Sequence, residues 1–161
     1  MPTRVYIETT IPSAYFNTRL EPESVARQNW TREWWDERRL LYEVVTSDAV
    51  LEELSCGTLA VTQSRLNLLH NLPLIEITPH VEEVAATYIE HKLMPVDSQG
   101  DALHLALASV HKCDILLTWN CRHLANYNKA AHIRLVNTEL GLHVPTLITP
   151  FELLEGDDDE R

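Results

Sequence analysis

Acidic side chains stand near the ends of several short apolar runs in the sequence. Glu8 directly follows the first run, Glu52 and Glu53 come shortly after the second, and Asp101 opens a later apolar segment. Carboxylates that are held close together repel one another, and a cation bound between them removes the repulsion. Mg²⁺ and Mn²⁺ prefer carboxylate and water oxygens, and they neutralise charge that develops on a phosphoryl group. These acids therefore predict a metal site whose substrate is a phosphodiester.

The elements that position these acids follow an alternating pattern. Segments with helical spacing separate five short runs typical of strands, which are residues 5–7, 42–46, 74–77, 115–118 and 146–148. Strands separated by helices predict parallel strands with right-handed crossovers. Such sheets bind ligands beyond the carboxyl ends of their strands, so we expect the acids to meet at one edge of a three-layer α/β domain.

The composition is that of one globular domain without excess positive charge. The 161 residues are 45% apolar and 23% charged, and 13 Lys and Arg against 24 Asp and Glu give a net charge of −11. Bulk attraction to phosphate cannot hold nucleic acid on such a chain, which excludes a generic DNA-coating protein but not an enzyme with a local, metal-screened site. We expect one domain over residues 1–150, followed over 151–161 by the start of a helix and a frayed acidic tail.

Nothing in the sequence predicts a membrane segment or a secretion signal. The longest apolar stretch, 102–110, is far too short to cross a bilayer. Glu8 interrupts the region where a signal peptide keeps its apolar core. The three cysteines (Cys56, Cys113 and Cys121) form no CxxC pair and are typical of reduced thiols. We therefore expect a cytoplasmic protein with no membrane partner.

Four short motifs occur in order between residues 4 and 150. They are YIETT at 6–10, VLEEL at 50–54, GDALHLA at 100–106 and TWN at 118–120. As an ordered set they resemble the motifs of the PIN-domain family, many of whose members are VapC-type toxins of toxin–antitoxin pairs. The resemblance selects Glu53, rather than Glu52, as the acid of the second motif.

The resemblance implies a five-stranded parallel sheet and metal-dependent cleavage of RNA, frequently by a homodimer. It implies that Glu8, Glu53 and Asp101 bind Mg²⁺ or Mn²⁺, and that Asn120 positions water or a second metal. If the resemblance extends to the toxins, it also implies an antitoxin partner that covers the acidic rim.

Two positions depart from the family pattern. Glu8 stands where Asp is commoner, which moves the carboxylate by about 1.5 Å, a shift that either a retracted rotamer or a small displacement of the metal can absorb. Asn120 stands where a fourth acid is usual, and it keeps a carbonyl oxygen but lacks the negative charge. We expect one well-held metal and a weaker second one. The alternative is a catalytically impaired PIN-like module that binds RNA or a protein partner.

Further polar residues beside the motifs each have a functional and a structural interpretation. These residues are Thr9, Thr118, Asp97, Arg122 and His123. The two threonines either fix a carboxylate or a water, or cap a segment. The aspartate either supports a metal ligand or belongs to a loop, and the basic pair either contacts a phosphate or packs the loop.

Other polar and aromatic residues fit the core better than a site. The histidines have no HExxH spacing, so we assign His104 and His111 to the core or its rim. Trp30 and Trp34 are one helical turn apart, which favours a core or a partner interface over base stacking. A receiver-type domain is excluded because the third run carries no Asp and the fifth no Lys, and a dinucleotide enzyme because there is no GxGxxG.

Overall fold

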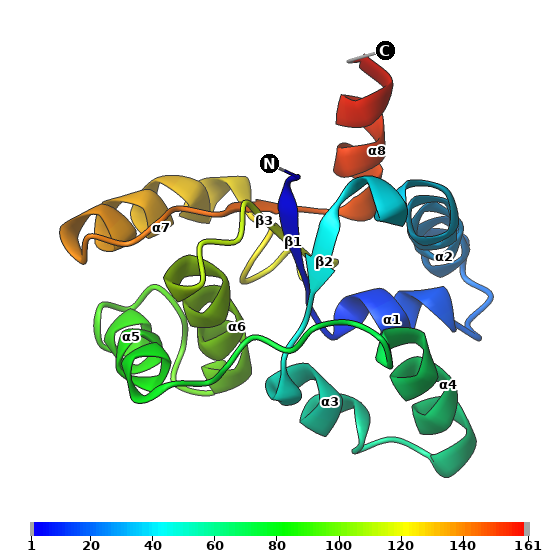
Figure 1. The fold of residues 1–161 in the computed structure, drawn as a ribbon, viewed down its shortest axis with the longest axis horizontal. Coiled ribbons are helices and arrows are strands. Elements are labelled where there is room, and N and C mark those ends of the chain that lie inside the picture. Colours follow the sequence, from blue (N-terminus) through cyan, green and yellow to red (C-terminus); the bar gives the residue numbers. More distant parts are fainter. Residues whose placement is uncertain (1, 160–161) are drawn as a thin grey trace.

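A parallel sheet forms the centre of the computed structural model, which describes residues 2–159 (Figure 1). Its four strands are β1 (Arg4–Ile7), β2 (Glu43–Val45), β3 (Ile115–Leu117) and β4 (Thr146–Ile148). They lie in the order β2-β1-β3-β4, and every neighbouring pair is parallel. The predicted α/β class with a parallel sheet is confirmed.

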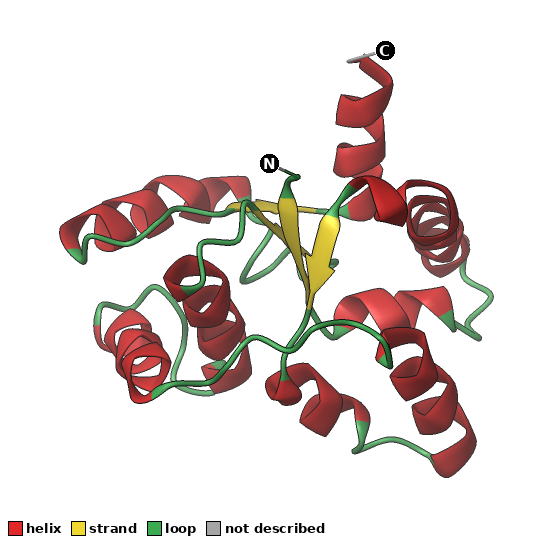
Figure 2. Ribbon diagram, in the orientation of Figure 1, coloured by secondary structure: helices red, strands yellow, loops and turns green. Residues whose placement is uncertain are grey.

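Helices cover both faces of this sheet. Between β1 and β2 lie α1 (Thr10–Tyr15), α2 (Pro22–Glu33), the π-helix η1 (Trp34–Arg38) and the 3₁₀-helix η2 (Arg39–Leu41). After β2 come α3 (Asp48–Leu54), α4 (Leu59–Leu69), α5 (Pro79–Glu90) and α6 (Gln99–Val110), and after β3 come α7 (Tyr127–Glu139) and, beyond β4, α8 (Pro150–Asp159). Figure 2 shows α5, α6 and α7 on one side of the strands and α1 and α2 on the other. The crossovers from β1 to β2 and from β3 to β4 run in opposite directions, so right-handed connections put their helices on opposite faces.

The prediction of a fifth strand over residues 74–77 is wrong, because this segment forms only a single bridge. Leu74 pairs with Thr46 in a parallel bridge, where the Ile75 main-chain N–H donates to the Thr46 carbonyl at 2.9 Å. Ser47 already begins the turn into α3 as its N-cap. Residues 75–77 therefore run past the end of β2, and the sheet has four strands in the described residues.

The core between the sheet and α6 explains the most apolar segments of the sequence. Val5, Tyr6 and Ile7 of β1 are all fully buried, as expected for a parallel strand covered on both faces. Leu105 and Leu107 of α6 are fully buried as well. The described helices include none with the length and apolar character needed to span a membrane.

The tryptophan-rich segment packs inside the protein, as its helical spacing predicts. Trp34 and Trp35 are both buried although they are consecutive. They lie in η1, where the wider turn of a π-helix departs from regular α-helical geometry. Trp30 is half-buried, and its ring packs against Phe151 of α8 with 4.5 Å between the ring centroids.

The acidic C-terminal segment is helical over most of its length. Where the sequence predicts only the start of a helix, α8 continues to Asp159. Leu153 and Leu154 on this helix are buried. Glu160 and Arg161, the last residues of the predicted frayed tail, lie outside the described residues.

We expect the substitution Leu105→Ala to destabilise the fold strongly. Leu105 is 0% exposed, and loss of a buried leucine side chain costs about 2–5 kcal/mol in transfer free energy and cavity formation. Leu135→Ala on α7 is the control, because Leu135 is 58% exposed and an exposed site changes stability by about 0.5 kcal/mol or less. Urea unfolding measures both, and equal effects of the two substitutions would contradict the described core.

Candidate active site

The site lies where the strand order reverses, at the carboxyl ends of β1 and β3. From β1 the chain continues to β2 on one side, whereas β3 lies on the other side. Ile7 at the end of β1 pairs with Leu117 at the end of β3, so Glu8 and Thr118 emerge side by side. Parallel α/β sheets bind ligands at such a reversal.

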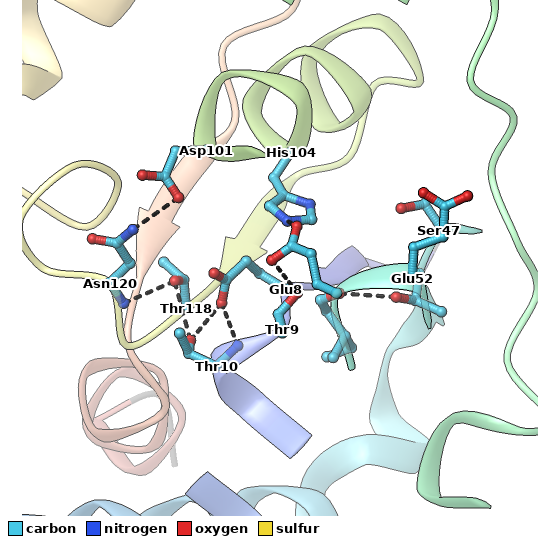
Figure 3. A network of polar contacts seen from close by, with 12 residues as sticks. Glu8, Thr9, Thr10, Ser47, Glu52, Asp101, His104, Thr118 and Asn120 are labelled. Carbon is cyan, nitrogen blue, oxygen red and sulfur yellow. Dashed lines mark hydrogen bonds and ion pairs between the residues drawn. The ribbon is translucent and has the colours of Figure 1, made fainter. Parts of the chain in front are cut away.

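We call Glu8, Glu53, Asp101 and Asn120 the acidic centre. Figure 3 shows how side chains from the ends of β1 and β3 and from the start of α6 are linked by polar contacts there. The predicted residues Thr9 and Thr118 belong to the same network.

Glu8 is folded back against the first turn of α1. Its Oε1 accepts hydrogen bonds from the Thr10 main-chain N–H at 2.7 Å and from the Thr10 hydroxyl. The side chain is only 3% exposed, and this burial raises the pKa of the Glu8 carboxyl, while the charge of His104 and the Thr10 hydrogen bonds oppose the rise. The extra methylene of Glu8 is thus accommodated by a retracted side chain.

Threonine hydroxyls connect Glu8 to the other half of the acidic centre. Besides donating to Glu8, the Thr10 hydroxyl accepts from the Trp119 main-chain N–H at 2.8 Å. Its oxygen is 3.3 Å from the Thr118 hydroxyl, which accepts from the Asn120 main-chain N–H at 2.9 Å. Thr118 thus caps the end of β3 and also contacts the hydrogen-bond network around Glu8.

Asn120 is committed to protein partners at both ends of its amide. Its Nδ2 donates to Asp101 Oδ1 at 3.0 Å, and its Oδ1 accepts from the His123 main-chain N–H at 3.0 Å. The predicted role, in which the carbonyl oxygen holds a water or a second metal, therefore requires this oxygen to serve a further partner. An acid here would instead place two carboxylates against each other.

Glu53 reaches the site from α3 and is held by two side chains. Its Oε2 accepts from the Thr9 hydroxyl at 3.0 Å, and its Oε1 lies 2.6 Å from His104 Nε2. The carboxylate rests on the first turn of α6, because a Cβ at Gly100 would lie 3.4 Å from Glu53 Oε1. Partial burial acts to raise the pKa of Glu53, but the hydrogen bond and charge of His104, with the Thr9 hydroxyl, lower it below its ordinary value of 4.5.

His104, which we predict to lie in the core or on its rim, hydrogen-bonds Glu53, and the motifs do not reveal this contact. It is 1% exposed, and its Nδ1 lies 2.7 Å from the Tyr6 hydroxyl, which in turn lies 2.8 Å from Ser47 Oγ. The signal that could have found it is its spacing: His104 is three residues after Asp101 on α6 and so shares its helix face.

The charge of His104 offsets the repulsion among the surrounding acids. Burial alone would lower the pKa of its imidazole, but the hydrogen bond to Glu53 and the charges of Glu8, Glu53 and Asp101 raise it above the ordinary value of 6.5. In the imidazolium form both ring nitrogens donate, one to Glu53 and the other to Tyr6. The raised pKa thus favours the imidazolium form, whose positive charge faces all three acids.

The remaining predicted residues lie differently. Asp97 and Arg122 are exposed, and in the described part of the chain neither side chain has a hydrogen bond or ion pair with the acidic centre. His123 contributes through its main chain, by binding Asn120 Oδ1. Lys129 on α7 was not predicted; its ammonium lies 3.4 Å from His123 Nδ1, and burial lowers its pKa while the charge of Asp101 opposes this.

The donor chemistry of the acidic centre fits a hard divalent cation, because carboxylate oxygens are its preferred ligands. The arrangement differs from the predicted site, since residues 2–159 contain no group of three or more His, Cys, Asp or Glu placed to hold a metal ion. Each oxygen of Glu53 already has one hydrogen-bond partner, Thr9 or His104, and keeps a further lone pair that a cation can use.

The fold and the site together define a class: parallel α/β domains with acids gathered where the strand order reverses. Comparison with family models finds a match to the PIN domain over residues 5–129, and the chain belongs to this family. A search of curated proteins finds no match. PIN domains are generally nucleases that act on nucleic acid and usually use divalent metal ions. The motifs predict this family correctly.

We expect Glu53→Gln to lower the pKa of His104, because the Glu53 hydrogen bond is the largest of the contributions that raise it. NMR titration of the imidazole measures this shift. A raised imidazole pKa stabilises the fold fully below the unfolded value of 6.5, and this contribution is lost as the pH rises through the folded value. Glu52→Gln, at the exposed neighbouring position, is the matched control, and an equal shift in both variants would contradict the described pair.

Proposed function

We propose that this protein is an endoribonuclease that hydrolyses RNA phosphodiesters at the acidic centre and depends on Mg²⁺ or Mn²⁺. The observation that carries the proposal is the gathering of Glu8, Glu53 and Asp101, from three distant segments, around one buried histidine. Such a concentration of negative charge is costly unless a cation compensates it. Membership of a nuclease family agrees with this chemistry.

Each residue has a role that follows from its contacts. Glu8, Glu53 and Asp101 would hold the divalent cation, and a cation bound there would lower the pKa of water and neutralise charge that develops on the phosphoryl group. Thr9 and His104 orient Glu53, and Thr10 orients Glu8. Asn120 positions Asp101 through its Nδ2 donor. The chain supplies no side-chain nucleophile in this scheme.

The finer assignment is to a VapC-like toxin of a toxin–antitoxin pair, as the sequence motifs favour. Its partner is then an antitoxin that covers the acidic rim, and an Arg that enters the acidic centre would block both the cation and the substrate. A homodimer and a cytoplasmic location belong to the same assignment.

A catalytically impaired PIN-like module is the second candidate, and one observation favours it. Asn120 is a neutral amide that hydrogen-bonds Asp101 and the His123 main chain, so it supplies no negative charge for a second cation. Such a module binds RNA or a protein partner without cleaving. A gain of cleavage that appears only in Asn120→Asp would support this candidate over the ribonuclease.

We expect wild-type protein to cleave single-stranded RNA in the presence of Mn²⁺ or Mg²⁺, and we expect cleavage to stop when EDTA removes the ion. Asp101→Asn lowers the cleavage rate by more than about 100-fold. Loss of a residue that only hydrogen-bonds a metal ligand already lowers metal affinity or activity by roughly 10- to 100-fold, and Asp101 is proposed as a ligand itself. Asp97→Asn is the matched control at an exposed position, and it keeps the wild-type rate. Cleavage that survives EDTA, or that Asp101→Asn leaves intact, would refute the proposal.

A further inference from the structure

A polar cavity lies beside the acidic centre, and its lining includes three arginines. Its volume is about 390 Å³, and its lining comes from α1, α2, α4 and the loops next to them. Figure 1 shows α1 between α2 and α4 at this place. Arg19 before α2, Arg27 on α2 and Arg65 on α4 belong to the lining, and none of the described lining residues is acidic. The chain has a net charge of −11, and this local group of arginines favours the binding of an anionic ligand.

Arg27 is held in place by its neighbours. Its guanidinium lies over the Trp119 ring, 5.1 Å from the centroid, and pairs with the exposed Glu23 carboxylate at 2.9 Å. Trp119 is itself fixed, because its indole N–H donates to the Thr31 hydroxyl at 2.8 Å. A guanidinium that is positioned in advance loses less conformational freedom when it binds a ligand.

Arg65 carries a buried donor without an acceptor. Its Nε is buried, and no hydrogen-bond partner for it exists among the described residues. A buried donor left unpaired costs free energy, so the hydrogen-bonding capacity of this guanidinium is not used up within the described residues. Phosphate oxygens match the fork of donors that a guanidinium presents.

The cavity and the acidic centre share a wall. Thr10 and Trp119 both line the cavity, and the hydroxyl of Thr10 donates to Glu8 while it accepts from the Trp119 main-chain N–H. The cavity and the acidic centre are therefore adjacent, and a single strand of nucleic acid that passes over Thr10 runs from one to the other.

We propose that Arg27 and Arg65, with Arg19 at the exposed side, bind a backbone phosphate of single-stranded RNA and place the adjacent phosphodiester at the acidic centre. This inference rests on the proposed ribonuclease function and deepens it, because it names the site that holds the substrate. The contacts are to the backbone, so they position the RNA without reading its sequence. They also explain how an acidic protein holds an anionic polymer.

The test is the binding of a fluorescently labelled, unstructured RNA oligonucleotide, followed by anisotropy in EDTA so that no cleavage occurs. Arg65→Gln and Arg27→Gln each weaken binding about tenfold, the size expected for one charge-assisted hydrogen bond. The slope of log K against log salt falls by about 0.7 for each arginine removed. Circular dichroism verifies that the variants are folded.

Arg134→Gln is the matched control. Arg134 is exposed on α7, on the other face of the sheet, and its substitution by Gln removes the same charge. It leaves both the affinity and the salt slope unchanged. The inference is overturned if wild-type protein does not bind the RNA, or if the arginine variants bind with the wild-type affinity and slope. Binding that depends on Arg27 and Arg65, together with no cleavage in Mn²⁺, refutes the proposed ribonuclease function alone.

Discussion

The repulsion among three carboxylates that share one edge of the sheet is the constraint on which the rest of the site depends. Glu8 is almost completely buried, and a buried carboxylate keeps its charge only where hydrogen bonds and opposite charge compensate the loss of water. The protein supplies this compensation from several elements. Thr10 binds Glu8, Thr9 and His104 bind Glu53, and Asn120 binds Asp101.

His104 has a central part in this balance because it contributes positive charge from inside the core. Its ring is tied to Tyr6 and through Tyr6 to Ser47, so the imidazole position is set by β1 and by the start of α3. These contacts hold Glu53 in place and leave each of its oxygens a further lone pair for a divalent cation.

The sequence predicts the parts of this account that depend on local pattern and on order along the chain. Buried apolar runs predict β1 and β3, the end of the first run places Glu8 at the rim of the sheet, and the start of the apolar segment that forms α6 places Asp101. What it misses depends on tertiary partners: residues 74–77 have a strand-like composition, but β2 ends before they can pair with it. The role of His104 and the cavity of Arg27 and Arg65 likewise arise from segments far apart in the sequence.

The central claim, that the acidic centre binds a divalent cation, is tested most directly by titrating the protein with Mn²⁺ and following free Mn²⁺ by electron paramagnetic resonance. The account predicts that wild-type protein and Glu52→Gln bind the ion, whereas Glu8→Gln binds it at least about tenfold more weakly while remaining folded, because a ligand charge is lost and a buried charge is removed. Binding by Glu8→Gln at the wild-type affinity, or no binding by wild-type protein, would contradict it.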